Sequence, residues 1–221
     1  LELFRNIKQV VFDKTGTLTN GKFVLDNWFI DAQKFTDGEA AFQQIVYSLE
    51  KYSNHPIARC IADNWKTTTD IRWAAIEEIK GLGMKATSKE GVEWIAGSFK
   101  AAKHTTTDDS HNVYLLRNGE LMGWIDVKDE LRPEAKGIID YLKQRHVKTI
   151  LLSGDREAKT KKIAAELGID EVIAERTPEQ KLATIAALTA QTPTAMVGDG
   201  INDAPALAKA TIGISLSEAS Q

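Results

Sequence analysis

The chain has 221 residues, of which 43% are hydrophobic and 27% are charged, and its formal net charge is −3. That length can bury one large core or two modest ones, and the weak, interspersed charge gives no basis for binding nucleic acid or an anionic membrane. A single cysteine excludes an internal disulfide framework, and no apolar run approaches the roughly 20 residues that a membrane-spanning helix needs.

The first elements along the chain are a short buried strand and a polar loop. The apolar residues 10–12 predict a strand that stops abruptly at Asp13, and a loop rich in threonine and glycine follows up to Gly21. Two interpretations of Asp13 remain open at this point. It is either an ordinary polar residue that ends a strand and caps a helix, or a reactive carboxyl group held at the edge of a sheet.

Residues 23–126 have the pattern of an α+β unit. Amphipathic helices are expected over 38–53 and from Pro56. Strand-like runs follow at 73–79, 84–88, 91–98, 112–117 and 120–127. The Asn118-Gly119 pair between the last two runs predicts a type I′ hairpin. We expect an antiparallel-sheet domain here, inserted into a second domain made of residues 1–22 and 127–221.

Residues 127–221 alternate between helices and strands. Strands are expected at 147–152, 171–174, 194–197 and 211–215, and helices at 133–142, 154–168, from Thr177 and at 202–210. The first helix should carry an apolar stripe of Ala135, Ile138, Ile139 and Leu142, Gly168 should close the second, and Thr177 with Gln180 should form a capping box at the start of the third. Continuous apolar strands separated by helices are typical of a parallel sheet covered on both faces. The fold class is therefore α/β, with a Rossmann-like parallel sheet that residues 10–12 should join.

Polar clusters follow several of these strands. Asp13 follows the first strand, Ser153 and Asp155 follow the strand at 147–152, and Asp199 follows the strand at 194–197. Ligands of open parallel sheets bind beyond the carboxyl ends of the strands. Carboxylates and hydroxyls without histidine or cysteine suit Mg²⁺, and an aspartate can act as a nucleophile for a phosphoryl group. The pattern favours phosphoryl transfer, although each Gly-Asp pair alone is an ordinary loop and helix cap.

Four motifs resemble those of P-type cation-transporting ATPases, which belong to the haloacid-dehalogenase-like superfamily. DKTGT (13–17) resembles their phosphorylation motif, DELRP (129–133) their D-x-x-R-P motif, SGD (153–155) their TGD motif and GDGINDAPAL (198–207) their hinge motif. The order and spacing also agree, and the resemblance covers nearly the whole chain. It implies a haloacid-dehalogenase-like phosphorylation domain with an inserted nucleotide-binding domain.

The resemblance implies a role for each residue of the phosphorylation site. Asp13 would accept the γ-phosphoryl group of ATP, and Lys181 would neutralise the charge on Asp13 and on the phosphoryl oxygens. Mg²⁺ would be held at Asp13, Asp199 and the main-chain oxygen of Thr15, with Asp203 nearby. The hydroxyls of Ser153 and Thr15 and the amide of Asn202 would hydrogen-bond the phosphoryl group. Asp155, Asp129 and Arg132 would serve the hinge and the phosphates or ribose of the nucleotide.

A second set of motifs narrows the resemblance to the heavy-metal-transporting members. SLEKYSNHP (48–56) resembles their S-x-H-P signature, and GLG (81–83) and IAGS (95–98) resemble their glycine motifs. By that match Glu50, His55, Gly81, Gly83 and Gly97 contact ATP. Glycines let a purine approach the backbone closely. His55-Pro56 taken alone is equally a turn before a helix, and GLG a turn between strands.

Thr15 separates two classes of enzyme. Phosphatases of the superfamily usually place a second aspartate two residues after the nucleophile, whereas this chain has a threonine, which is a poor general base. An aspartyl phosphate should then persist long enough to be coupled to a conformational change. The alternatives considered are a soluble phosphatase of the same superfamily, with the insert as a capping domain, and a non-catalytic nucleotide-binding module.

The resemblance also implies partners that lie outside this sequence. The chain would be the cytoplasmic part of an integral membrane protein whose membrane domain carries the metal. Copper is the expected ion, and zinc, cadmium, lead and cobalt stay open because pumps for these metals share the same cytoplasmic motifs. An actuator-type domain of the same protein would supply dephosphorylation. The expected small-molecule partners are ATP and Mg²⁺.

Overall fold

The computed structural model describes residues 5–200 and 203–216. They form two compact units, one from the two ends of the chain and one from its middle. The first comprises residues 1–21 and 130–221 and the second residues 22–129, whereas the sequence places the boundaries after residues 22 and 126. No helix among the described residues is long and apolar enough to cross a membrane.

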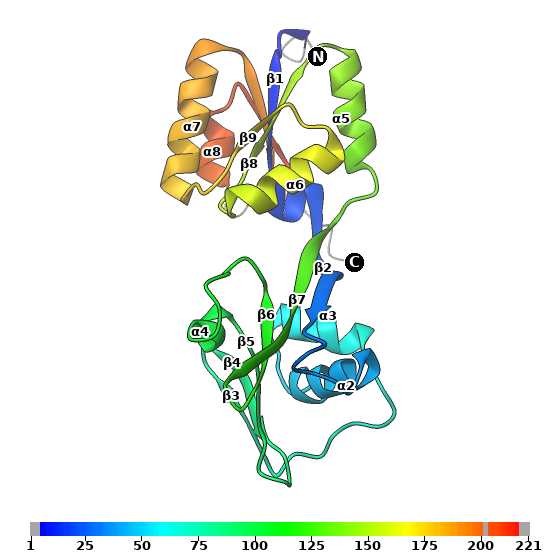
Figure 1. The fold of residues 1–221 in the computed structure, drawn as a ribbon. Coiled ribbons are helices and arrows are strands. Elements are labelled where there is room, and N and C mark those ends of the chain that lie inside the picture. Colours follow the sequence, from blue (N-terminus) through cyan, green and yellow to red (C-terminus); the bar gives the residue numbers. More distant parts are fainter. Residues whose placement is uncertain (1–4, 201–202, 217–221) are drawn as a thin grey trace. The chain divides into compact units, whose positions relative to one another are not determined.

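The first unit contains a five-stranded parallel sheet (Figure 1). Its strands are β1 (Gln9–Asp13), β8 (Lys148–Leu152), β9 (Glu171–Ile173), β10 (Thr194–Gly198) and β11 (Ile212–Ser215), in the order β11-β10-β1-β8-β9. The predicted parallel sheet is therefore confirmed, and β1 lies at its centre. Because β8 and β10 flank β1, the polar residues that follow these three strands meet at one edge of the sheet.

Helices cover both faces of this sheet, as Figure 1 shows. The helices α5 (Ala135–Gln144) and α6 (Glu157–Leu167) pack with Val10 and Phe12 of β1. On the opposite face, α7 (Pro178–Gln191) and α8 (Ala204–Lys209) pack with Val11. Alternate residues of β1 thus enter two separate cores, which explains why the strand is continuously apolar.

Three local expectations can be compared with the helices of this unit. Gly168 ends α6 in the left-handed conformation, and Thr177 and Gln180 form the predicted capping box at the start of α7. The apolar stripe expected on α5 is wrong at Ile138, which is 50% exposed, whereas Ala135 and Ile139 are buried. A ten-residue helix on a sheet buries only the narrow stripe that faces the strands, so a residue at its flank stays outside.

The second unit contains a six-stranded antiparallel sheet in the order β2-β7-β6-β5-β4-β3. Its strands are β2 (Thr19–Ile30), β3 (Ala75–Ile79), β4 (Gly83–Thr87), β5 (Glu93–Gly97), β6 (Val113–Arg117) and β7 (Glu120–Leu131). The hairpin between β6 and β7 has positive φ at both Asn118 (49°) and Gly119 (81°), as a type I′ turn requires.

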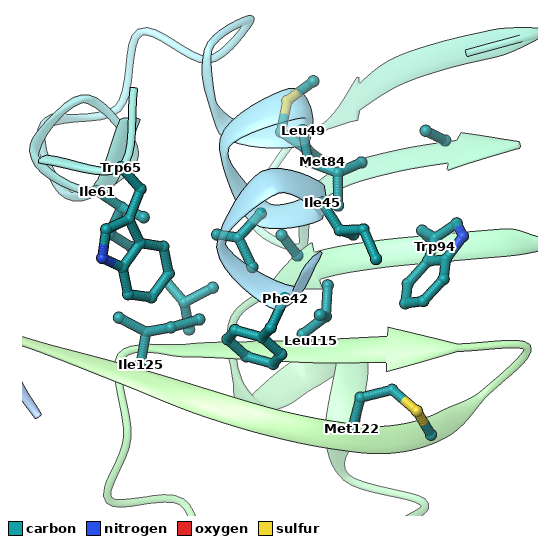
Figure 2. Close-up of a cluster of buried hydrophobic side chains, with 14 of the residues drawn as sticks. Phe42, Ile45, Leu49, Ile61, Trp65, Met84, Trp94, Leu115, Met122 and Ile125 are labelled. Carbon is teal, nitrogen blue, oxygen red and sulfur yellow. The ribbon is translucent and has the colours of Figure 1, made fainter. Parts of the chain in front are cut away.

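The main core of the second unit lies between this sheet and two helices. The helices α2 (Glu39–Glu50) and α3 (Pro56–Asn64) cover one face, and Figure 2 shows Phe42, Ile45 and Leu49 of α2 against the strands. The short helix α4 (Phe99–Ala102) packs in a smaller cluster with Tyr114. The predicted insert of helices and antiparallel strands is therefore confirmed as an α+β unit.

Candidate active site and nucleotide pocket

Asp13 is the last residue of the central strand β1 and is 4% exposed. The next residues form a helical turn, η1 (Lys14–Leu18), in which Gly16 has φ of 73°. A side chain at Gly16 would be strained by that φ, and its Cβ would stand 3.3 Å from the Cβ of Asp199. The sheet order thus brings the loop that follows β1 against the loop that follows β10.

Lys181 reaches this edge from the first turns of α7. Its Nζ lies 2.5 Å from Oδ1 of Asp13 and 3.6 Å from Oδ1 of Asp203. The capping box at Thr177 fixes the start of α7 four residues earlier, which sets the position from which the lysine extends. One partly exposed ammonium group therefore stands between two buried carboxyl groups.

Burial dominates the electrostatics of Asp13. It raises the pKa of Asp13 from 3.8 to about 6, while the hydrogen bond and charge of Lys181 lower it and Asp203 raises it further. Burial lowers the pKa of Lys181, but the hydrogen bond and charge of Asp13, with a contribution from Asp203, outweigh this and raise it. The lysine therefore stays a cation, and the site holds more carboxylate charge than one lysine balances.

Two contacts hold the loop after Asp13 in place. Arg132 donates from its backbone N–H to the carbonyl of Leu18 (2.8 Å) and from Nη2 to the carbonyl of Gly16 (3.2 Å). Lys14, which is buried, forms an ion pair with Asp155. The side chain of Thr15 is exposed in the middle of this loop, at the position predicted to face the phosphoryl group.

The loop after β8 lies beside them. Ser153 is buried, and its hydroxyl accepts a hydrogen bond from the backbone N–H of Asp155 (3.1 Å). Asp155 therefore joins the two loops, because its backbone is fixed on Ser153 and its carboxylate contacts Lys14. This pairing was not anticipated, because lysine and aspartate 141 positions apart carry no local signal.

The described donors fit a hard cation such as Mg²⁺. Oδ2 of Asp203 is buried and has no hydrogen-bond partner among the described residues. Asp203 is close enough to Asp13 to raise the pKa of Asp13, and Asp199 lies against Gly16. Residues 5–200 and 203–216 contain no group of three or more His, Cys, Asp or Glu that could hold a metal, and Mg²⁺ characteristically uses one or two carboxylates with phosphate and water. Asn202 lies outside the described residues.

The second unit contains a cavity of about 610 Å³. All five residues expected to contact ATP line it: Glu50, His55, Gly81, Gly83 and Gly97. Of the other predicted nucleotide-contacting residues, Asp129 lies on β7 in this unit, whereas Arg132 and Asp155 belong to the first unit. The volume is in the range of small-molecule binding sites.

Two of the glycines are required by the strands themselves. Gly83 of β4 and Gly97 of β5 are paired in the sheet. A Cβ at Gly83 would lie 2.2 Å from the carbonyl oxygen of Ala96, and one at Gly97 would lie 2.5 Å from that of Leu82. Glycine at these two positions therefore has a second explanation besides access for a purine. The backbones of the paired strands approach too closely to leave room for a side chain.

His55 and Glu50 present different chemistry to the cavity. His55 is the N-cap of α3, and its Nδ1 accepts from the N–H of Ile57 (3.3 Å), so a neutral ring carries its proton on Nε2. Glu50, at the end of α2, is buried, and burial together with the charge of Glu78 raises its pKa from 4.5 to about 8. At neutral pH the Glu50 side chain is therefore mainly a carboxylic acid, able both to donate and to accept.

The sequence reasoning missed Glu78 as a lining residue of this cavity. Its carboxylate accepts a hydrogen bond from the hydroxyl of Ser53 (2.7 Å). The pairing of β3 with β4 could have indicated it, because Glu78 stands opposite the buried Met84 and so shares its face of the sheet.

Comparisons with known proteins agree with this geometry. The sequence model of the haloacid dehalogenase-like hydrolase family matches residues 7–211. The zinc-transporting ATPase of Bacillus subtilis is 35% identical, over 98% of this chain and 36% of its own length. The copper-exporting P-type ATPase B of Archaeoglobus fulgidus is also 35% identical, over 97% of this chain and 32% of its own. The chain therefore spans about a third of the length of these relatives.

Two solved ATPase structures also match nearly the whole chain. A zinc-transporting PIB-type ATPase matches 97% of this chain with a TM-score of 0.81 and 30% identity, over 36% of its own chain. The catalytic domain of the CPx-ATPase CopB-B matches 95% of this chain with a TM-score of 0.73 and 29% identity, over 80% of its own chain. With Asp13 at the edge of a parallel sheet and an inserted α+β unit, the chain belongs to the haloacid dehalogenase-like hydrolases, and the relatives that it resembles over nearly its whole length are zinc- and copper-transporting P-type ATPases.

Proposed function

We propose that this chain is the ATP-binding and phosphorylation unit of a heavy-metal-transporting P-type ATPase, on the cytoplasmic side of the membrane. Residues 1–22 and 127–221 would form the phosphorylation domain and residues 23–126 the nucleotide-binding domain. One observation carries the proposal, the buried carboxyl group of Asp13 at the end of β1 with Lys181 Nζ 2.5 Å away. The similarity to copper- and zinc-transporting ATPases supports it.

In the reaction, a carboxylate oxygen of Asp13 attacks the γ-phosphorus of ATP. The bond from that phosphorus to the β–γ bridging oxygen breaks, and ADP leaves with the electron pair, so that an aspartyl phosphate remains. Lys181 offsets the negative charge of the nucleophile and of the phosphoryl oxygens, and the hydroxyl of Ser153 and the backbone N–H groups of the Gly16 loop stabilise the same oxygens.

The metal and the hinge residues complete this proposal. Asp13, Asp199 and the main-chain oxygen of Thr15 would hold Mg²⁺, with Asp203 nearby, and the ion would neutralise charge on the transferred phosphoryl group. Asn202 would hydrogen-bond the phosphoryl oxygens. Arg132 and the Lys14–Asp155 pair would position the loop that carries Thr15, which agrees with their contacts to that loop.

Thr15 accounts for the fate of the intermediate. Its hydroxyl can hydrogen-bond the phosphoryl group, but it does not activate water as a carboxylate would. Hydrolysis of the aspartyl phosphate then needs a group from another domain of the full-length protein, and the energy of the intermediate is available for moving the metal through a membrane domain.

Labelled ATP tests the acceptor residue. The 221-residue chain, or a longer protein that contains it, is incubated with Mg²⁺ and ATP labelled at the γ-phosphate. Label should appear on the wild-type protein, be released by hydroxylamine as acyl phosphates are, and be lost in Asp13→Asn. Asp140→Asn, which alters a surface pair with Lys136, is the matched control and should keep the label. Equal labelling of Asp13→Asn would show that Asp13 is not the acceptor.

For the transported ion we propose copper, with zinc as the alternative. Relatives named for each metal are equally similar to this chain, at 35% identity. The full-length protein in vesicles should form phosphoenzyme when Cu(I) is supplied and fail to do so with Zn(II). The reverse result would assign the protein to zinc, and rapid hydrolysis of small phosphate esters without affinity for ATP would make it a soluble phosphatase.

A further inference from the structure

A second acidic residue shares the nucleotide cavity with Glu50. Glu78 lies on the edge strand β3, opposite Met84 of β4 in the antiparallel register. Met84 is buried in the core under α2 and α3, so Glu78 is on the face of the sheet that those helices cover. Its neighbour Glu77 pairs with Lys85 and has the opposite orientation.

A chain of two hydrogen bonds connects Glu78 to His55. The hydroxyl of Ser53 donates to Oε1 of Glu78 (2.7 Å) and accepts from the backbone N–H of His55 (3.1 Å). Ser53 is buried, and its own N–H donates to the carbonyl of Glu50 (3.0 Å). The turn between α2 and α3 is thereby held from both sides, and it presents Glu50 and His55 to one cavity.

We propose that Glu78 is a positioning residue of the nucleotide pocket: its carboxylate orients the Ser53 hydroxyl, which fixes the turn that carries His55, and it shares one cavity with the carboxyl group of Glu50. This inference rests on the proposed binding of ATP to the cavity. Glu78 acts through Ser53, His55 and Glu50.

The presence of Glu78 and Glu50 in one cavity has a consequence for purine recognition. The edge of adenine presents an amino donor beside a ring-nitrogen acceptor, which a carboxylic acid can match with its carbonyl and its hydroxyl. A carboxylate offers acceptors alone. Burial and the charge of Glu78 raise the pKa of Glu50 to about 8, so ATP binding should weaken as the pH rises above that value.

Several other charged or titratable groups face the two cavities that Glu50 lines. They are His55, Glu78 and Lys80 in one, and Tyr47, Lys51, Arg59, Asp63 and Lys66 in the other. Glu50→Gln isolates the contribution of Glu50, because an amide keeps one donor and one acceptor but does not titrate. ATP affinity of this variant should be nearly flat from pH 7 to 9.

Calorimetric titration with ATP and excess Mg²⁺ at pH 7 tests the hydrogen-bond chain. Glu78→Ala and Ser53→Ala should each raise the Kd about fivefold, the usual effect of one net hydrogen bond, and the double variant should be no weaker than either. Glu78→Gln keeps an acceptor for Ser53 and should bind nearly as the wild type. Glu77→Ala and Glu77→Gln are the matched controls and should leave the Kd unchanged.

The pH profile tests the effect of charge. Glu78→Gln removes a like charge near Glu50, so the pH at which ATP affinity falls should move to lower values, whereas Glu77→Gln should not move it. Unfolding midpoints measured on the same samples exclude a folding defect.

The outcomes separate this inference from the proposed function. If the wild type binds ATP but the Glu78 variants match their Glu77 controls in Kd and in pH profile, the inference is wrong and the proposed function stands. If Glu78→Gln is as weak as Glu78→Ala, or if the Glu78 and Ser53 effects are additive, the hydrogen-bond chain is wrong. If the wild type does not bind ATP at all, both are wrong.

Discussion

Asp13 and Glu50 are two buried carboxyl groups with raised pKa values and different proposed roles. Asp13 has the ammonium group of Lys181 at 2.5 Å, which favours the charged, nucleophilic form against the effect of burial. Glu50 has the carboxyl group of Glu78 in its surroundings, which adds to the effect of burial and favours the acid. Burial raises both pKa values, and in the proposed function the nearest charged group decides which carboxyl group would react and which would recognise a ligand.

Glu50 should make the stability of the protein depend on pH. The folded chain keeps the Glu50 proton up to about pH 8, whereas the unfolded chain releases it near 4.5. Between these values the folded state binds more protons, so the free energy of unfolding should fall as the pH rises, by up to about 1.4 kcal/mol per pH unit. Glu50→Gln should lack this contribution, and denaturant titrations of both proteins at pH 5, 6.5 and 8 would measure the difference in slope.

Parallel slopes for the wild type and Glu50→Gln would contradict the expectation. Glu78→Gln should behave as an intermediate case. Removal of the like charge should lower the pKa of Glu50, while the carboxyl group of Glu50 stays in place. Its pH dependence should lie between those of the other two proteins.

Thr15 should determine how long the aspartyl phosphate persists. Thr15→Asp places a carboxylate two residues after the nucleophile, in a loop where the side chain is exposed, and it supplies a general base for attack by water. Loss of label after a chase with unlabelled ATP should accelerate on the order of 100-fold. Thr15→Ser is the control and should keep the slow rate; an unchanged lifetime in Thr15→Asp would contradict this role of Thr15.

At the scale of elements, the proposed nucleotide cavity depends on how closely β4 approaches β5. Gly83 and Gly97 face each other across these strands, and a Cβ on either would collide with a carbonyl oxygen. The same strands carry the lining residues Met84 and Ala96. A change at these glycines therefore acts on the sheet first and on the ligand second.

Gly83→Ala should destabilise the second unit by about 1–3 kcal/mol and weaken ATP binding, because its Cβ would lie 2.2 Å from the carbonyl oxygen of Ala96. Gly91→Ala is the matched control. Gly91 also has positive φ, at 84°, but a Cβ there meets nothing within 4 Å. Gly91→Ala therefore has the unfavourable backbone conformation without the steric collision. Equal unfolding midpoints for the two variants would show that the collision contributes nothing.

Several elements were predictable because their signals are local. The capping box of α7 and the hairpin at Asn118-Gly119 are both present as expected. The parallel order of the sheet followed from strands that are apolar on both faces. The exposure of Ile138 and the ion pair of Lys14 with Asp155 were not predictable, because each depends on where elements far apart in the sequence come together.

At the scale of the whole molecule, the proposed site residues fall into two sets in separate compact units. Asp13, Lys181 and Asp203 belong to the unit made of residues 1–21 and 130–221, and the cavity with Glu50 and His55 belongs to residues 22–129. Each unit has its own hydrophobic core, so each should respond separately to the ligand that it binds.

Hydrogen exchange measured by mass spectrometry should separate the two responses. ATP at 100 times its Kd should stabilise the second unit by about 2.7 kcal/mol and slow exchange within residues 22–129. Mg²⁺ with beryllofluoride, which mimics a phosphoryl group on an aspartate, should slow exchange in the first unit. His55→Ala should abolish the first effect and Asp13→Asn the second; loss of ATP protection in Asp13→Asn would contradict the assignment of separate sites.

Short sequence motifs are enough to predict the proposed chemistry of this protein. Asp13 with Thr15 two residues later, the polar residues after successive strands and the glycines of the insert are properties of short segments, and together they predicted the family and the fold class. Which of these groups meet depends on the packing of distant elements. Lys181 reaches Asp13 across 168 positions and Glu78 reaches Ser53 across 25. Such contacts arise from strand order and register, which long-range packing sets and no local pattern encodes.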